Sequence, residues 1–287
     1  MTRIVDAHLH VWDRTVSDYA WITPELGPLD RSFSAEEARV VLAAAGVDGA
    51  ILVQAEDSLA DTRFLLDTAR THDWVDGVVG WLPLDAPYVA RTALDEIAAD
   101  PALRGIRHLV HDDPRDEFLD LREVRASLAE LVRLGLVFEV PDAWPRHLAG
   151  ARRVAEAVPG LTVVIDHLAK PPVGRADFDD WRREFDRVAE LPNTVAKFSG
   201  LHLPGVALDG GVAGTLLEIA LAGFGADRLM YGGDWPMSVP HGGYAPTWRV
   251  MRAAIDRITS PNERAAVLGG TAMRVYSRTN GATGRTD

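Results

Sequence analysis

Short apolar segments rich in β-branched residues recur along the whole chain of 287 residues. Each segment has the length of a strand rather than of a helix, and a continuous apolar run of that length is typical of a strand that is buried on both faces. We predict eight such strands, over residues 3–7, 49–55, 77–82, 105–110, 136–140, 162–166, 194–199 and 229–232.

Each predicted strand is followed by a segment whose apolar residues recur at spacings of three and four, which is typical of an amphipathic helix. These helices are predicted over residues 35–45, 60–72, 89–99, 119–134, 146–158, 178–190, 211–224 and 247–258. Eight strand–helix pairs in succession predict an α/β protein with a (β/α)8 TIM-barrel fold.

A doubly wound open sheet is the alternative arrangement of the same elements. The first strand is not followed by the GxGxxG pattern of dinucleotide-binding sheets, which weakens that alternative. No composition break divides the chain, so we predict one domain over residues 1–277 and a polar tail over residues 278–287. The connection over residues 13–33 is unusually long, and loops of that length are often lids or binding loops.

Composition limits the kinds of partner. The formal net charge is −12 and Lys and Arg do not cluster, so we expect neither nucleic acid nor anionic membrane as a partner. No apolar run approaches membrane-spanning length, no export signal is recognisable, and there is no cysteine, so a cytoplasmic location is expected. The sequence does not determine the oligomeric state, and a homo-oligomer is one of the possible states.

Ionisable residues gather at the ends of the predicted strands, where TIM barrels carry their active sites. Because side chains alternate between the faces of a strand, positions 6, 8 and 10 should share one face, so that His8 and His10 reach the same point. The strand ends supply the following candidates: Asp6, His8, His10, Arg107, His108, Glu139, Asp166, His167, Lys197 and Asp234.

Some of these residues also have a purely structural interpretation. Asp166 can be a buried supporting group, His108 can point outward beside Arg107, and Lys197 can form an ion pair in the core. His202 and His241 lie in loops, where a solvated histidine is as common as a ligand. As a set, however, ionisable groups at six of eight strand ends are hard to explain by packing alone.

Six motifs of the sequence resemble the amidohydrolase-2 branch of the amidohydrolase superfamily, and within it the sugar-lactone hydrolases of the L-fuconolactonase and L-rhamnonolactonase type. They run in order from residue 4 to about residue 277: DAHLHVWD, GIRHLVHDDP, IDHLAKPP, KFSGL, YGGDWP and LGGTAMRVY. The resemblance implies a barrel in which His8, His10 and Asp234 surround the reaction centre.

The resemblance also bears on whether the site binds a metal ion and through which residues. Members with one metal ion add a histidine on strand five, where this chain has Glu139, whose carboxylate can take the missing place beside Zn²⁺ or Mn²⁺. Other lactonases of the branch work without a required metal. The predicted ligand set is therefore His8, His10, Glu139 and Asp234, with a divalent metal as an optional cofactor.

We therefore predict a hydrolase that opens the lactone ring of a sugar acid. Asp234 is the expected general base, the three histidines His8, His10 and His167 are expected to polarise the carbonyl, and Lys197 is expected to stabilise the oxyanion. Substrate contacts are expected from Arg107, His108, Trp12, Trp21 and Trp235. A metal-dependent decarboxylase of the same branch and an inactive sugar-binding barrel are the alternatives.

Overall fold

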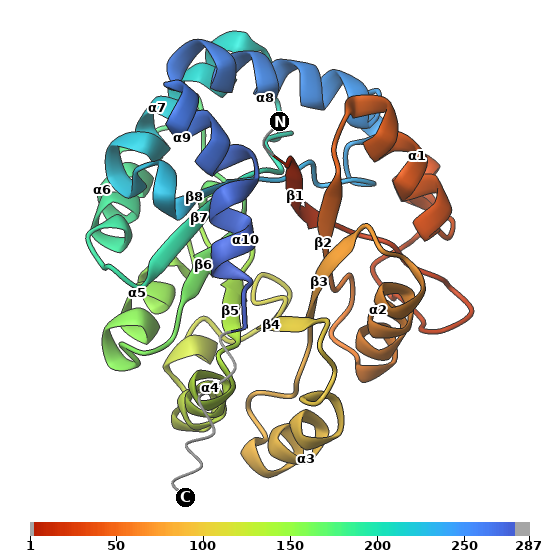
Figure 1. Cartoon of the computed structure of the whole chain (residues 1–287). Coiled ribbons are helices and arrows are strands. Elements are labelled where there is room, and N and C mark those ends of the chain that lie inside the picture. The colour runs from red at the N-terminus through yellow and green to blue at the C-terminus, as the bar shows by residue number, and fades with distance from the viewer. Residues whose placement is uncertain (1–2, 279–287) are drawn as a thin grey trace, which may run out of the picture.

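The computed structural model describes residues 3–278 and confirms the predicted (β/α)8 barrel as a single domain. Neighbouring strands are parallel and follow one another in chain order around the barrel (Figure 1). The strands are β1 (Val5–Leu9), β2 (Gly49–Val53), β3 (Val75–Gly80), β4 (Leu103–Arg107), β5 (Val137–Val140), β6 (Val163–Ile165), β7 (Thr194–Phe198) and β8 (Leu229–Tyr231). All but the first two residues of β3 and the second of β4 are buried, as expected of strands covered on both faces.

The α-helices, except for the two short ones at the end of the chain, form the outer ring that covers the strands (Figure 1). They are α1 (Ala35–Ala45), α2 (Leu59–Thr71), α3 (Pro87–Ile97), α4 (Arg122–Leu134), α5 (Leu148–Ala157), α6 (Phe178–Ala189), α7 (Gly210–Phe224), α8 (Tyr244–Ile258), α9 (Pro261–Ala265) and α10 (Thr271–Val275). No helix among residues 3–278 is both long enough and apolar enough to span a membrane. Of the predicted tail, residues 279–287 lie outside the described part of the chain.

Two apolar layers hold the barrel together. The larger layer lies between the strands and the helices, and the smaller one consists of inward-facing side chains such as Val53, Val79 and Val164. Ala272 of α10 and the following Tyr276 pack into the inner layer, and α10 lies across the barrel in Figure 1. The barrel is therefore filled at one end, and its functional groups lie at the other.

The seam between the first and last strands is closed around Asp6. Its carboxylate accepts hydrogen bonds from the backbone N–H groups of His8 and Gly233, both at 2.9 Å, and from the Tyr244 hydroxyl at 2.7 Å. The backbone N–H of Asp234 donates to the carbonyl of His8 at 2.9 Å. One buried carboxylate thus joins β1 to the loop after β8.

The expectation that position 6 shares a face with positions 8 and 10 is wrong. Asp6 points outward to Tyr244 of α8, whereas His8 and His10 belong to the mouth of the barrel. The register between β1 and β2 shifts between Asp6 and Leu9, and such an irregularity breaks the simple alternation of faces.

The long connection over residues 13–33 is packed against the barrel. Tyr19 is fully buried, and its hydroxyl donates to the Asp61 carboxylate of α2 at 2.5 Å. The second oxygen of Asp61 accepts from the backbone N–H of Ala55 at 3.0 Å, and burial raises the pKa of Asp61 to about 7. The connection is therefore fastened to the end of β2.

Tyr19→Phe should lower the free energy of unfolding by about 1–3 kcal/mol, because it leaves a buried carboxyl oxygen without its donor. Urea denaturation followed by circular dichroism measures this change. Tyr88→Phe is the matched control, because Tyr88 is 84% exposed and should be insensitive. Equal stabilities of the two variants would contradict the fastening role of Tyr19.

Candidate active site

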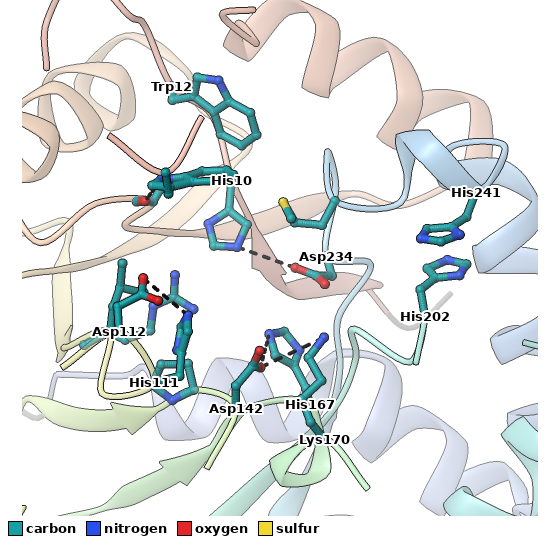
Figure 2. A pocket seen from close by; sticks show the side chains of 16 residues that line it. His10, Trp12, His111, Asp112, Asp142, His167, Lys170, His202, Asp234 and His241 are labelled. Carbon is teal, nitrogen blue, oxygen red and sulfur yellow. Dashed lines mark hydrogen bonds and ion pairs between the residues drawn. The ribbon is translucent and has the colours of Figure 1, made fainter. Parts of the chain in front are cut away.

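An open cavity of about 360 Å³ lies at the carboxyl ends of the strands. Figure 2 shows His10 and Trp12 on one side of it, Asp142, His167 and Lys170 on another, and Asp234 between them. The complete lining is His10, Trp12, Trp21, Ala55, Arg107, Leu109, His111, Asp112, Pro141, Asp142, His167, Lys170, His202, Asp234, Met237 and His241. A volume in this range is typical of small-molecule sites.

The two histidines of β1 face each other, with their Nε2 atoms 3.1 Å apart. Nδ1 of His10 lies 2.8 Å from the carbonyl oxygen of Val53, which can only accept, so Nδ1 carries the proton and Nε2 has a free lone pair. Nδ1 of His8 lies 3.1 Å from the Lys197 ammonium, which donates. His8 therefore carries its proton on Nε2 and donates it to His10. Burial, reinforced by the Lys197 charge, holds the pKa of His8 well below its usual range, so the ring is neutral.

Lys197 lies beneath these histidines and is fully buried. Its ammonium donates to Glu139 at 2.6 Å and lies 3.1 Å from Asp166 Oδ1. The second oxygen of Glu139 accepts from the Tyr276 hydroxyl. Both oxygens of Glu139, predicted as a metal ligand, thus have partners below the cavity floor, and Lys197, predicted to be catalytic, is part of the same buried cluster.

Asp234 stands in the loop after β8 and reaches the two histidines from the other side. Its Oδ1 lies 3.5 Å from His10 Nε2 and 3.8 Å from His8 Nε2. Burial would raise the pKa of Asp234, but His167, His10 and Lys170 outweigh burial and hold that pKa below its usual range. The carboxylate is therefore ionised at neutral pH and can accept a proton.

His167 comes from a turn of unusual backbone conformation. Residues 167–170 all have positive φ values, 55°, 52°, 62° and 55°, although none is glycine. Left-handed backbone costs such residues roughly 1–2 kcal/mol each. The turn places His167 and Lys170 in the cavity, with His167 Nδ1 2.9 Å from the Ser199 hydroxyl.

The closest polar partner of Lys170 is a backbone carbonyl. Its ammonium donates to the carbonyl of Gly200 at 2.9 Å and lies 4.0 Å from the Asp142 carboxylate. Arg107 donates to the carbonyl of Gln54 and to Asp166, the latter at 3.4 Å. Both cations of the lining are thus held by groups of the protein.

Two loop histidines close the far side of the cavity. The rings of His202 and His241 stack with centroids 4.2 Å apart and planes 5° apart. Thr247 donates its hydroxyl proton to the carbonyl of Gly243 at 3.1 Å, so at 2.9 Å it accepts from His202 Nε2. Nδ1 of His202 is then an acceptor, and burial lowers the pKa of the ring to about 4.

The predicted substrate contacts divide into two groups. Arg107, Trp12 and Trp21 line the cavity, and the indole N–H of Trp21 donates to the carbonyl of Ala55 at 2.7 Å. His108 and Trp235 are not among the lining residues. His108 stacks on Phe118 with centroids 4.1 Å apart, and Trp235 packs edge-on against Phe33.

Sequence reasoning missed several lining residues because they stand in loops. Asp142 follows β5 by two positions, and Met237, His111 and Asp112 also lie beyond strand ends. Lys170 was contained in the motif IDHLAKPP but was not singled out. Its place within that motif, three residues after His167, was a signal that could have found it.

The donor set can hold a divalent metal. His8, His10 and Asp234 each offer one ligand atom within 4.8 Å of the others, and so do His8, Asp166 and His167. To bind a metal through Nε2, His8 must carry its proton on Nδ1, 3.5 Å from Asp166 Oδ1. That oxygen is buried and lies 3.1 Å from the Lys197 ammonium, and its second lone pair can accept a hydrogen bond from His8 Nδ1. Imidazole and carboxylate are ligands that zinc and manganese accept.

Known proteins resemble this chain over nearly its whole length. It is 33% identical to an L-fucono-1,5-lactonase of Burkholderia ambifaria, with 96% of each chain covered. It is 30% identical to an L-fucono-1,5-lactonase of Burkholderia multivorans, with 95% of each covered. A crystal structure of a Burkholderia multivorans amidohydrolase with bound zinc has a TM-score of 0.86 at 30% identity, covering 96% of this chain and 99% of that one.

The family model described as amidohydrolase matches residues 5–278. This range includes every strand of the barrel and every residue that lines the cavity. Together with the lactonase relatives, the match confirms the resemblance expected from the six motifs. The chain therefore belongs to the amidohydrolase family.

Proposed function

We propose that this protein hydrolyses the lactone of a sugar acid, an aldono-1,4- or 1,5-lactone. The observation that carries the proposal is the ionised carboxylate of Asp234 in an open cavity, with His8 and His10 at 3.8 Å and 3.5 Å from it and His167 as a further neighbour. The similarity to two L-fucono-1,5-lactonases supports the same reaction class.

The reaction requires one water molecule. Asp234 takes a proton from this water, and the resulting hydroxide forms a bond to the lactone carbonyl carbon. The bond between that carbon and the ring oxygen then breaks, and the proton returns from Asp234 to the departing alkoxide. His10 and His167 line the cavity beside Asp234, His8 is buried and donates to His10, and the buried positive charge of Lys197 favours the developing oxyanion.

The charge of the lining favours an uncharged substrate. Three carboxylates, Asp112, Asp142 and Asp234, line the cavity against two cations, Arg107 and Lys170. Both cations lie near carboxylates of the protein, Arg107 at 3.4 Å from Asp166 and Lys170 at 4.0 Å from Asp142, so neither is an isolated positive charge for a substrate carboxylate. This argues for a neutral hydroxylated lactone and against the acidic substrate that a decarboxylase requires.

Ring opening creates a carboxylate in this negatively lined cavity. Repulsion between the product and Asp112, Asp142 and Asp234 favours product release. Trp21, which is partly exposed, offers an aromatic surface for a sugar ring, and the buried Trp12 packs edge-on against it. The neutral substrate and the anionic product are thereby distinguished by charge.

A divalent metal would be held by His8, His10 and Asp234. When bound, such a metal polarises a carbonyl and lowers the pKa of water. The hydrolysis of a lactone also makes a smaller demand than that of an amide, because its leaving group is an alkoxide. We therefore propose the metal as an optional cofactor rather than a required one.

Asp234→Asn should lower kcat on aldonolactones about 100- to 10,000-fold, because the amide cannot act as the general base. Acid release from a panel of five- and six-carbon aldonolactones, followed with a pH indicator, measures this. Asp95→Asn, an exposed position on α3, is the control and should retain the parental rate. Absence of lactone hydrolysis by the parent protein, or an unchanged rate in Asp234→Asn, would overturn the proposal.

Gly200→Ala should lower kcat about 100-fold, a loss of the size that small misplacements of catalytic groups produce. A Cβ at Gly200 would lie 2.2 Å from His167 Nδ1 and 2.8 Å from Asp234 Oδ2, so both side chains must move. Gly205→Ala is a matched control in the same loop, since both glycines have positive φ but nothing lies within 4 Å of a Cβ at Gly205. Equal activity of the two variants would contradict this view of the site.

Zinc retention tests the proposed ligands independently of turnover. After incubation with Zn²⁺ and dialysis, the parent should retain about one zinc ion per chain by elemental analysis. His10→Ala should retain much less, because it lacks one of three ligands. His72→Ala, which changes a histidine at the end of α2, should match the parent. No retained zinc in the parent, or equal retention in His10→Ala, would exclude this ligand set.

A further inference from the structure

A second cavity, of about 400 Å³, adjoins the first. The two cavities share four lining residues, His111, Asp142, Lys170 and His202, which lie opposite Trp12 in Figure 2. The second cavity is thus a continuation of the candidate active site across the Lys170–Asp142 pair. The reaction proposed above makes no use of it.

The outer wall of the second cavity is apolar and rigid. Trp144 forms part of it, and its indole N–H donates to the Asp177 carboxylate at 2.9 Å, which fixes the plane of the ring. The backbone N–H of Trp144 donates to the carbonyl of Ala169 at 3.1 Å, inside the left-handed turn. Four prolines, which have little conformational freedom, complete the wall: Pro145, Pro171, Pro172 and Pro204.

The boundary shared by the two cavities is polar. Lys170 brings donors, Asp142 brings acceptor oxygens, and Nδ1 of His202 is an acceptor because Nε2 donates to Thr247. Groups of both kinds are what the hydroxyls of a sugar require, since each hydroxyl both donates and accepts. An aromatic wall next to such a boundary suits a sugar ring, which has apolar faces and a polar edge.

Each of the two Lys and Arg side chains that line the second cavity lies near a carboxylate of the protein. Arg175 lines it, but its guanidinium lies 3.3 Å from the Asp177 carboxylate, and Lys170 faces Asp142. An alkyl or aryl substituent on the substrate would leave the polar groups of the boundary without hydrogen-bond partners. A neutral sugar ring satisfies both the boundary and the wall.

We propose that the second cavity is a subsite for a second sugar ring attached to the lactone. The substrates would then include lactones of disaccharide acids, with the lactone ring over Asp234 and the second ring against Trp144. This inference rests on the proposed lactone hydrolysis and extends it to a larger substrate class.

The test compares kcat/KM for an aldono-1,5-lactone and for the same lactone bearing a glycosyl substituent. The parent should hydrolyse both. Trp144→Ala should lose about tenfold in kcat/KM on the glycosylated lactone, mainly through KM, and little on the simple lactone. Trp144→Phe, which keeps an aromatic face, should recover most of the loss, and the exposed-site variant Tyr88→Ala should resemble the parent.

A second variant covers the case in which Trp144→Ala does not fold. Val206→Trp would fill the second cavity while Trp144 stays in place, and it should block only the glycosylated lactone. Equal losses on both lactones, or a parent that rejects the glycosylated lactone, would overturn the subsite.

Binding of the glycosylated lactone separates this proposal from the proposed function. If the parent hydrolyses no lactone, saturation-transfer NMR with the intact, uncharged glycosylated lactone still tests the second cavity. If the parent binds this ligand and Val206→Trp does not, the result supports the subsite even though the proposed reaction has failed. Absence of binding, or equal binding by Val206→Trp, overturns it.

Discussion

The buried ammonium of Lys197 is the charge on which the site depends. It lies without solvent exposure between the carboxylates of Glu139 and Asp166 and also contacts His8. A buried ion is tolerated only when it is paired, because its transfer from water costs far more than a hydrogen bond returns. The two carboxylates balance the charge of Lys197, and Lys197 in turn selects the tautomer of His8. The charge balance in the core therefore sets the direction of the hydrogen bond between His8 and His10.

The conformation of the backbone places the other side chains of the site. The register shift in β1 turns Asp6 away from the histidines and lets it join β1 to the loop that carries Asp234. The left-handed turn over residues 167–170 brings in His167 and Lys170, and Gly200 leaves the space that the His167 ring occupies. Strain in the turn is offset by close packing, since Leu168 and Ala169 are fully buried. The site is thus rigid before a substrate binds.

The fold could be predicted from the sequence because its periodicities are local. Strand runs and helix spacings identified all eight β/α units, and the observed β3, Val75–Gly80, begins only two residues before the predicted range. His8, His10, His167 and Asp234 were found because each lies within three residues of the end of a strand. Individual orientations were less predictable. The orientation of Asp6 was predicted wrongly because an irregularity in register is invisible in the sequence. Asp142 and His111 were not selected because loop positions follow no period that marks a side chain as facing the cavity.

The two charge patterns of the site have different physical roles. Lys197 below the floor and the buried Arg107 in the cavity lining are close to carboxylates where little solvent reaches, so their fields act strongly on the histidines. In the open cavity, Asp112 and Asp142 add negative charge that solvent partly screens. A neutral lactone enters such a cavity without an electrostatic penalty, whereas the acid formed from it carries a charge of the same sign as the lining. The same arrangement therefore favours binding before ring opening and release after it.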